Sequence, residues 1–532
     1  MFFLFLFAVF IEDTVYVKAS FPYAEELKFD FPAFSQVIAL NGNPESILNE
    51  SGSILLKQYG NLSSFSIRGT RTQDIDIELN GIPLKTVQND YVDVSILPSS
   101  LNYKGIVVKH PLSSYGSISS PGGGIFLNME PVQGAGLGIF SDRILEMFLN
   151  WRIMGSWLWV SMSRKNTEEA DDFTRLLLLF SGKDASVLFA TRNAGTPGPS
   201  GTLIKGRKNE ILAGYSLSLF NSKPVRAMLR GNISSLSYKD AATSDRHKSF
   251  YNTLSLQNNF AAFSFITEYI SSSKAGCRKR NTISLMFKKD VSLGDFLTVL
   301  NASIFYVDKY GKTFGTVFWG LSKRFNGIVV YSNYSKGVHL PSFFDLYWPE
   351  DAFAKGNTEL LPEYIVQYEA GAKYLKSHTT LYLTLFNRKV ENMIQWIPVE
   401  GKYSPFNTGS HGLYGIEGKI EYQDSKISAG FNGSICFFDE ILYYPHIEEG
   451  FYLKAGGFRL GVFYVGKRQK RPGSIKSLPP MEIIDLNYER RFVKNVIFDI
   501  GIKNLLDESE EWIAGYPQGG RVFYTKIRVK WR

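Results

Sequence analysis

The sequence contains no run of about 18 uncharged apolar residues, the length that a membrane-spanning helix needs. Its most apolar internal segment, residues 144–162, is interrupted by Glu146, Asn150 and Arg152. Apolar residues at helical spacing are also scarce. Because backbone groups find no hydrogen-bonding partner in hydrocarbon, a membrane protein without spanning helices must be a closed β-barrel. The sequence therefore leaves two classes open, a soluble β protein and a membrane barrel.

Cysteine and histidine are also scarce. The two cysteines, Cys277 and Cys436, lie far apart and in no metal-binding spacing. They could pair in an oxidising periplasm or remain two free thiols. The six histidines are dispersed, and no nucleophile motif connects them to serines or carboxylates. We therefore expect no enzyme, no catalytic residues, no bound metal and no cofactor, although His339 and His411 could each contact haem.

The formal net charge of +9 does not point to nucleic acid. Lysine and arginine are spread along predicted strands, and no nucleic-acid-binding motif accompanies them. We expect these basic groups to lie in a hydrated lumen and on loop surfaces, with no nucleic-acid partner.

Aromatic residues and glycine are abundant, and the C-terminal segment shows how they are used. Apolar residues alternate with polar or cationic ones from Phe523 to Trp531, as on a strand with one apolar and one polar face. Lys526, Arg528 and Lys530 occupy the polar face. A soluble sandwich would turn the apolar face inward, whereas an outer-membrane barrel would turn it toward lipid.

The same alternation recurs at residues 366–374, 416–422 and 496–503, where one face is charged or small. Such a face is too polar for the core of a sandwich, so the pattern favours a barrel with a hydrated interior. Roughly 400 residues at about 18 per strand predict about 22 antiparallel strands, enclosing a lumen wide enough to need a plug. We assign this transmembrane β-barrel to residues 132–532.

Residues 21–131 differ from the rest and form the natural plug. Short strands are predicted at residues 75–79 and 105–109, with an Asn-Gly turn at Asn80 and a short helix from residue 44. We expect a compact α+β unit inside the barrel lumen.

The N-terminus allows two interpretations. Residues 1–11 are apolar and resemble the remnant of a signal peptide, although no basic region precedes them. Residues 12–20 are either the end of that signal or the start of the mature protein. In the second case they would suit an extended peptide that adds a strand to a partner's sheet.

Short motifs along nearly the whole chain resemble the TonB-dependent outer-membrane receptors. Each motif alone is weak, but their order and spacing together are specific. They comprise Ser66-Ile67-Arg68-Gly69-Thr70, Glu78-Leu79-Asn80-Gly81-Ile82-Pro83, Ser113-Ser114-Tyr115-Gly116, Gly123-Gly124-Ile125, residues 340–349, Phe406-Asn407-Thr408-Gly409, residues 503–507 and Gly520-Arg521. The short barrel and residues 345–349 look most like vitamin B12 and siderophore receptors.

The resemblance implies energised uptake of a scarce metal chelate, namely a siderophore, cobalamin or haem, across the outer membrane of a Gram-negative cell. It implies TonB with ExbB and ExbD as partners, insertion by the barrel assembly machinery, contact with outer-membrane lipid, and a monomer. It also favours a TonB box that binds TonB. The TonB-binding residues would be Asp13, Thr14, Val15, Tyr16, Val17, Lys18 and Ala19. The alternative is a passive porin or a structural barrel that has lost energy coupling.

Three groups of candidate site residues follow. Turns at the apex of the plug are expected to bind the ligand through Arg71, Thr72, Gln73, Asn89, Asp90 and Tyr91. Arg68 is expected to hold the plug by pairing with Glu369 and Glu417 of the barrel wall. The acidic segment 168–172 could bind calcium in an extracellular loop.

Overall fold

The computed structural model describes most of the chain after residue 53. The described residues are 54–59, 62–101, 103–112, 120–167, 171–197, 205–222, 225–241, 243–351, 354–438, 441–470, 477–509 and 511–531. The predicted helix from residue 44, the signal remnant and the TonB box all lie outside these residues.

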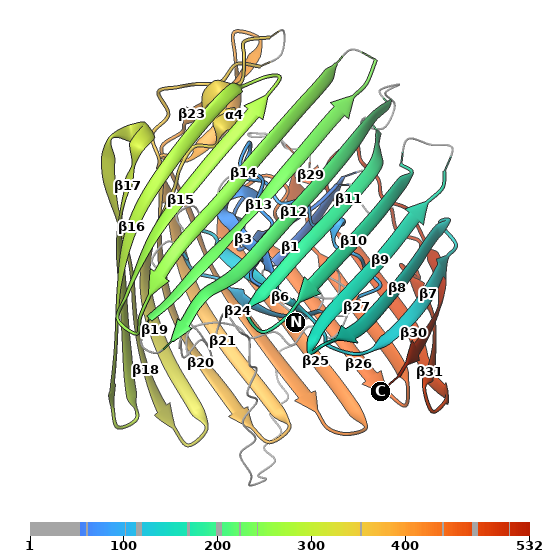
Figure 1. The fold of residues 1–532 in the computed structure, drawn as a ribbon. Coiled ribbons are helices and arrows are strands. Elements are labelled where there is room, and N and C mark those ends of the chain that lie inside the picture. Colours follow the sequence, from blue (N-terminus) through green and yellow to red (C-terminus); the bar gives the residue numbers. More distant parts are fainter. Residues whose placement is uncertain are drawn as a thin grey trace.

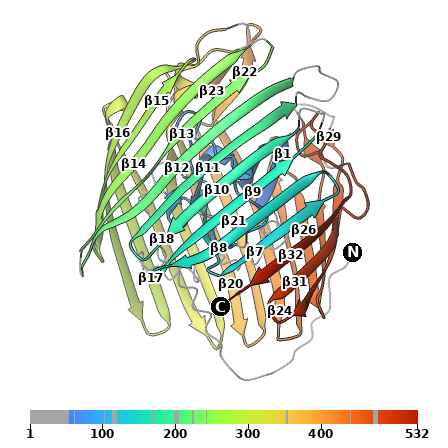
Figure 2. The same cartoon turned by 45° about the vertical axis from the view of Figure 1, so that its right-hand side comes forward.

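Twenty-two antiparallel strands form one closed barrel, which confirms the predicted strand number and fold class (Figures 1 and 2). The barrel closes where β32 pairs with β7, with Lys530 opposite Gly134 and Tyr524 opposite Phe140. The barrel strands are β7 (Gly134–Phe140), β8 (Ile144–Ile153), β9 (Ser156–Lys165), β10 (Phe173–Ser181), β11 (Ala185–Pro197), β12 (Lys205–Ser222), β13 (Val225–Lys239), β14 (Ser244–Gln257), β15 (Ala261–Ser272), β16 (Gly276–Leu293), β17 (Phe296–Val307), β18 (Lys312–Phe325), β19 (Ile328–His339), β20 (Glu363–Lys376), β21 (Thr379–Glu391), β24 (Ser410–Gln423), β25 (Ile427–Phe438), β26 (Ile447–Ala455), β27 (Phe458–Val465), β30 (Met481–Val493), β31 (Val496–Lys503) and β32 (Val522–Lys530).

The barrel wall has an apolar outer face and a polar inner face, as the alternation predicts. On β32, Phe523 and Ile527 are 52% and 42% exposed on the outside. On β20, Tyr368 faces outward, whereas its neighbour Glu369 is buried inside. Among the described residues, no helix has the length and apolar character needed to cross a membrane.

The two ends of the barrel differ in their connections. At one end, successive strands are joined by turns of two or three residues, such as 154–155, 294–295 and 326–327. The other end carries the long connections, including residues 340–362 and 392–409. In outer-membrane barrels the short turns face the periplasm and the long loops face outside. β7 begins and β32 ends at the short-turn end, which is the lower end in Figure 1.

Within the described residues, the long loops contain the regular structure that lies outside the plug and the barrel wall. The connection after β19 contains the helix α4 (Phe343–Tyr347), and the 3-10 helix η4 (Asp308–Tyr310) follows β17. Two hairpins, β22 (Ile394–Val399) with β23 (Lys402–Asn407) and β28 (Arg468–Gln469) with β29 (Ser477–Leu478), complete the loops.

The N-terminal region lies inside the barrel, as the blue strands in Figure 1 show. A mixed sheet has the order β4-β3-β6-β5, and β1 pairs with β2. The elements are β1 (Ile54–Tyr59), β2 (Leu62–Ile67), η1 (Thr72–Asp74), β3 (Ile75–Leu79), β4 (Ile82–Pro83), η2 (Val94–Ile96), β5 (Tyr103–Val108) and β6 (Gly123–Met129). We refer to the described residues 54–130 as the plug.

The plug agrees with the local predictions where the structure describes it. The strand predicted at residues 75–79 is β3, and the one predicted at residues 105–109 corresponds to β5. Asn80 and Gly81 form the turn between β3 and β4, both with positive φ, which Asn and Gly adopt most readily. The domain boundaries at residues 20 and 131 stay predictions.

One continuous apolar core joins the plug to one side of the wall. Ile77, Leu79 and Ile125 of the plug belong to the same buried cluster as Leu177 and Leu188 of β10 and β11. Burying this shared surface stabilises the plug in the lumen, because each fully buried aliphatic side chain contributes roughly 1.5–3 kcal/mol.

A charge on the outer face should destabilise the barrel. Leu385, in the middle of β21, is 55% exposed on the outside. We expect Leu385→Arg to lower the free energy of unfolding in lipid vesicles by about 2–4 kcal/mol, because the guanidinium would lie in hydrocarbon. Denaturant titration followed by tryptophan fluorescence measures this change.

Leu506→Arg is the matched control, because Leu506 is similarly exposed, at 50%, but lies in the long loop after β31. The control should change the free energy of unfolding by less than about 0.5 kcal/mol. Equal effects of the two substitutions would contradict the assignment of the outer face of β21 to lipid.

Candidate functional site: the charged contact between plug and barrel wall

Arg68 occupies an unusual backbone position directly after β2. Its φ is +48° and that of Gly69 is +71°, so two successive residues lie in the left-handed region. A non-glycine residue in this region costs roughly 1–3 kcal/mol unless its surroundings hold it there. The side chain of Arg68 is 2% exposed, and its guanidinium lies 4.2 Å from the ring centroid of Phe386 on β21.

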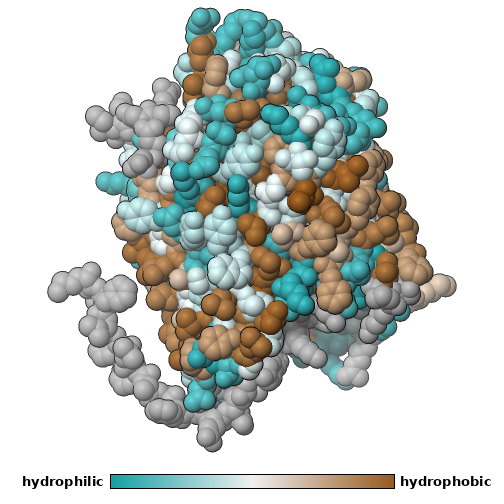
Figure 3. All heavy atoms as spheres, turned by 90° about the vertical axis from the view of Figure 1, so that its left-hand side faces the viewer, coloured by the Kyte–Doolittle hydropathy of each residue, from teal (hydrophilic) through white to brown (hydrophobic). Residues whose placement is uncertain are grey.

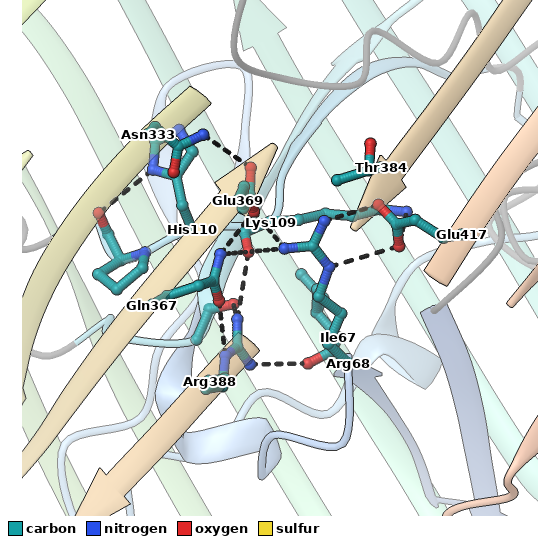
Figure 4. A network of polar contacts seen from close by, with 12 residues as sticks. Ile67, Arg68, Lys109, His110, Asn333, Gln367, Glu369, Thr384, Arg388 and Glu417 are labelled. Carbon is teal, nitrogen blue, oxygen red and sulfur yellow. Dashed lines mark hydrogen bonds and ion pairs between the residues drawn. The ribbon is translucent and has the colours of Figure 1, made fainter. Parts of the chain in front are cut away.

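Two glutamates of the barrel wall hold the Arg68 guanidinium (Figure 4). Arg68 Nη2 donates to Glu417 Oε1 of β24 at 2.6 Å, and Arg68 Nη1 forms a short ion pair with Glu369 of β20. The plug residue Lys109 adds an ion pair with Glu417 Oε2 at 3.2 Å. Sequence analysis proposed that Arg68, Glu369 and Glu417 pair, and the structure brings these three residues together.

The wall also contacts the plug backbone next to Arg68. Arg388 of β21 donates to the carbonyl oxygens of Ile67 and Lys109 at 3.2 and 3.1 Å. Gln367 of β20 donates to the carbonyl oxygen of Lys109 at 2.9 Å and to Glu369 at 2.6 Å. We call Arg68, Lys109, Gln367, Glu369, Arg388 and Glu417 the Arg68 network.

Burial and neighbouring carboxylates shift the pKa of the two plug cations of the Arg68 network, Arg68 and Lys109, in opposite directions. Burial lowers the pKa of Arg68, but Glu369 and Glu417 outweigh it, so the pKa of Arg68 lies above its ordinary value. Burial lowers the pKa of Lys109 below its ordinary value despite the attraction of Glu417. The charged form of Arg68 is therefore the favoured one.

A second charged group lies at the start of β20. Arg71 Nη2 donates to Asp74 Oδ1 at 3.0 Å and forms a short ion pair with Glu363. His339 Nδ1 lies 3.4 Å from the same Asp74 oxygen. Burial raises the pKa of Asp74, but Arg71 and His339 outweigh it and lower the pKa below its usual range.

Asp74, His339 and Glu363 have the donor types of a metal site, with one ligand atom each within 4.8 Å of the others. However, the guanidinium of Arg71 already contacts both carboxylates. A metal ion between them would have to displace this guanidinium, so the group fits an ion-pair contact between plug and wall better than a metal centre.

Further ion pairs join the plug to other parts of the wall. Asp93, at the N-terminus of η2, pairs with Arg192 of β11 at 2.7 Å and Lys208 of β12 at 3.0 Å. Glu78 of β3 pairs with Arg230 of β13 at 3.0 Å. Burial raises the pKa of Glu78 to about 7, although Arg230 opposes the shift. Charged contacts therefore surround the plug on several sides of the lumen.

The predicted ligand-binding residues lie in two plug turns with largely internal contacts. Arg71 bonds Asp74 and Glu363 as described, and buried Thr72 donates to the carbonyl oxygen of Phe65 at 3.0 Å. Gln73 belongs to η1 and is half-buried. In this turn, contacts within the plug and with the barrel wall account for what the structure shows.

The second turn is held in the same way. Asn89 Oδ1 lies 3.0 Å from Thr86 Oγ1, and buried Asp90 pairs with Lys85 at 3.1 Å. Half-buried Tyr91 uses its backbone carbonyl to accept from Thr86 Oγ1 at 2.6 Å. Ligand binding by either turn stays a prediction.

The other candidates are placed as follows. Residues 13–19 lie outside the described part of the chain, as do Glu168 and Glu169 of the acidic segment. The remaining acidic residues, Asp171 and Asp172, form ion pairs with Lys165 and Arg207. Both cysteines are free, Cys277 exposed and Cys436 buried, so they do not pair with each other.

Sequence analysis missed a group of aromatic and cationic side chains around α4. Tyr347 lies beneath Arg278 at 4.3 Å and Lys309 at 5.3 Å, and Trp348 lies 5.7 Å from Lys274. Ser342 and Asp345 cap each other's backbone at the start of α4. This capping box can be recognised in the sequence and predicts the start of a helix at this position. We call Lys274, Arg278, Lys309, Tyr347 and Trp348 the aromatic–cationic rim.

The family model described as "TonB dependent receptor-like, beta-barrel" matches residues 228–505, just over half of the chain. The chain belongs to the TonB-dependent receptor family. Its members are receptors and transporters, and the fold places this receptor in the Gram-negative outer membrane.

Similar proteins span several substrates. The vitamin B12 transporter BtuB of Vibrio vulnificus is 23% identical over 204 residues, which cover 36% of this receptor and 32% of BtuB. The chain thus spans about a third of that relative. The ferric enterobactin receptor PfeA of Pseudomonas aeruginosa has a TM-score of 0.74 at 11% identity, covering 98% of this receptor and 100% of PfeA. The copper transporter OprC has a TM-score of 0.72 at 13% identity, covering 94% and 98%. These two structures share the fold.

Removing the central cation should loosen the plug. We expect Arg68→Ala to destabilise the seating of the plug by roughly 3–5 kcal/mol, because it leaves two buried glutamates without their main partner. Hydrogen exchange of plug peptides in the detergent-solubilised receptor measures this as faster exchange near residue 68.

Arg207→Ala is the matched control, because the Arg207–Asp172 pair is exposed. Its effect should stay below about 1 kcal/mol. Arg68→Ala combined with Glu417→Gln should recover part of the protection, since one uncompensated charge is removed. Unchanged exchange in Arg68→Ala would refute the role assigned to the Arg68 network.

Proposed function

We propose that this receptor imports a scarce metal chelate, a siderophore, cobalamin or haem, by TonB-driven rearrangement of its plug. The observation that carries the proposal is the Arg68 network, in which a plug loop is tied to the wall by buried ion pairs and hydrogen bonds rather than by apolar contact alone. Such pairs can be exchanged for water or for a polar ligand once the loop moves. A passive porin would need neither a plug nor these contacts.

The ligand would enter from the end with the long loops. The aromatic–cationic rim lies there, at the end of α4, on η4 and around the start of β16. Cations next to aromatic faces suit a ligand that is both anionic and conjugated, as many metal chelates are. The similar proteins support this class, because their names refer to vitamin B12, ferric enterobactin and copper.

TonB, with ExbB and ExbD, is the proposed energy source. Residues 13–19 would pair with TonB in the periplasm as an added β-strand. The position of the barrel's first strand supports this arrangement. β7 begins at the short-turn end, which faces the periplasm, so the preceding plug and N-terminal residues connect to the barrel on that side. The receptor would work as a monomer inserted by the barrel assembly machinery.

Uptake measurements test the proposed function. We expect cells that carry the receptor to accumulate one radiolabelled member of a panel of ferric siderophores, haem and cobalamin. Deleting residues 13–19 should abolish accumulation but leave binding to whole cells unchanged, because binding needs only the outer surface. Deleting residues 21–27, the same number of residues, controls for the loss of chain length and should leave accumulation intact.

Two outcomes would contradict the proposal. Uptake that persists after the deletion of residues 13–19 would favour a passive porin. Neither uptake nor binding of any panel member, in a correctly inserted receptor, would favour a structural barrel without energy coupling.

The aromatic–cationic rim allows a sharper test of binding. Arg278→Ala should weaken binding of the transported chelate roughly tenfold, since a partly desolvated cation–π or charge contact contributes roughly 1–2 kcal/mol. Equilibrium binding to the purified receptor measures the affinity. Arg246→Ala is the control, because Arg246 lies at the same end of the barrel but on its outer face. Equal affinities of the two variants would exclude the rim from the binding surface.

A further inference from the structure

Four cations gather on the lipid side of the barrel at its long-loop end. They are Lys239 at the end of β13, Arg246 and Lys248 near the start of β14, and Lys279 near the start of β16. All four side chains are exposed. We call them the outer cationic patch.

The strand alternation shows that these side chains point away from the lumen. On β14, His247 and Ser249 are buried inside, so Arg246 and Lys248 face the other way. On β16, Arg280 is fully buried inside the lumen, which places Lys279 on the outer face. The patch is therefore separate from the Arg68 network and from the aromatic–cationic rim.

The outer cationic patch lies directly above the apolar band. Farther along the same faces come Ile233 of β13, 53% exposed, Leu254 of β14, and Ile283 of β16, 46% exposed. Hydrophilic side chains gather toward the long-loop end in Figure 3, with hydrophobic ones mainly below. The patch thus lies where the hydrocarbon of the outer leaflet meets its headgroups.

The pairing register brings the four cations together with hydroxyl groups. Lys248 lies opposite Ser235 on one side and Ser271 on the other. Arg246 lies opposite Ser237, and Lys279 lies opposite Tyr269. Neighbouring strands are about 4.8 Å apart, and Lys279 is displaced by two residues along the strand relative to Lys248. The two residues, two strands apart, are therefore separated by roughly 12 Å.

Nearby carboxylates have other partners. Asp245 pairs with Lys274 at 3.7 Å, Asp172 pairs with Arg207 at 2.6 Å, and Asp308 accepts from Asn281 at 2.7 Å. Within the described part of the chain, none of the four side chains of the patch forms an ion pair. Four cations on neighbouring strands repel one another unless an anion from outside the chain lies among them.

We propose that the outer cationic patch binds the phosphorylated headgroup of a glycolipid in the outer leaflet. The patch supplies cations and hydroxyls to the phosphates, and the apolar band beneath it contacts the acyl chains. This combination distinguishes a lipid from a free anion, because a soluble phosphate would gain nothing from the apolar surface. The proposal concerns the lipid face of the receptor and does not depend on which chelate it imports.

Native mass spectrometry of the full-length receptor in detergent tests the proposal. The probes are bisphosphorylated lipid A and the same lipid without phosphates. We expect the quadruple variant Lys239→Gln, Arg246→Gln, Lys248→Gln, Lys279→Gln to bind bisphosphorylated lipid A at least about tenfold more weakly than the wild type, because each cation near an anionic headgroup contributes to binding. The dephosphorylated lipid should bind both proteins weakly and equally.

A matched control changes four exposed cations near the short-turn end. These are Lys183→Gln, Lys289→Gln, Arg490→Gln and Arg491→Gln. The control should bind lipid A as the wild type does, and unchanged heat-modifiable electrophoretic mobility shows that each variant is folded. Equal binding by the quadruple variant, or equal binding of the dephosphorylated lipid by the wild type, would overturn the proposal. Complete displacement of lipid A by millimolar inorganic phosphate would also overturn it, since the patch would then be a general anion site.

Discussion

The structure depends on one constraint, that every backbone amide in the hydrocarbon layer must find a partner within the protein. A sheet satisfies this only by closing on itself, and here residues Tyr524 to Lys530 of β32 pair with β7. Closure with 22 strands makes the lumen too wide for the wall side chains alone to fill. The plug follows from the barrel, because something must occupy that lumen if the protein is not to be an open pore.

The plug has two kinds of contact with the wall. An apolar core continues from β3 and β6 into β10 and β11, and the strength of such contact depends on area rather than on direction. The Arg68 network is different, since each donor and acceptor has a fixed partner. Buried ion pairs add little net stability compared with apolar packing, but losing one partner is costly. They therefore specify where the plug lies and offer contacts that water or a polar ligand can replace when it moves.

Charge is distributed differently on the two faces of the wall. Inside, many cations pair with carboxylates, as Arg68 does with Glu417 and Arg192 does with Asp93. On the outer face of β13, β14 and β16, cations stand without carboxylate partners among the described residues. Inside the lumen the plug excludes water. A charged side chain there loses its hydration and therefore needs a partner of opposite charge. Outside, the membrane itself can provide the opposite charge, which makes an unpaired cationic patch tolerable only at the headgroup level.

The sequence by itself determined the barrel, its strand number and the orientation of its strands. A period of two residues is a local property, so the outward position of Phe523 and Ile527 and the inward position of Glu369 and Glu417 could be predicted from their neighbours alone. The β3 strand and the Asn80-Gly81 turn are likewise local. The proposed pairing of Arg68 with the two glutamates came from charge sign and strand face, and the structure places the three in contact.

Beyond that pairing, only the tertiary structure decided which groups meet across the lumen and which are exposed together on the surface. Arg68 and Glu417 are 349 residues apart, and no local pattern records that Arg388 would bond the backbone beside them. In the sequence, the turns at Arg71 and Asp90 look like open polar loops. In the structure, Arg71 pairs with Glu363 of the wall, and Asp90 pairs with Lys85 of the plug. The outer cationic patch depends on the register of four neighbouring strands. Register is set by pairing along the whole sheet, so contacts between distant segments cannot be derived from the spacing of residues within one of them.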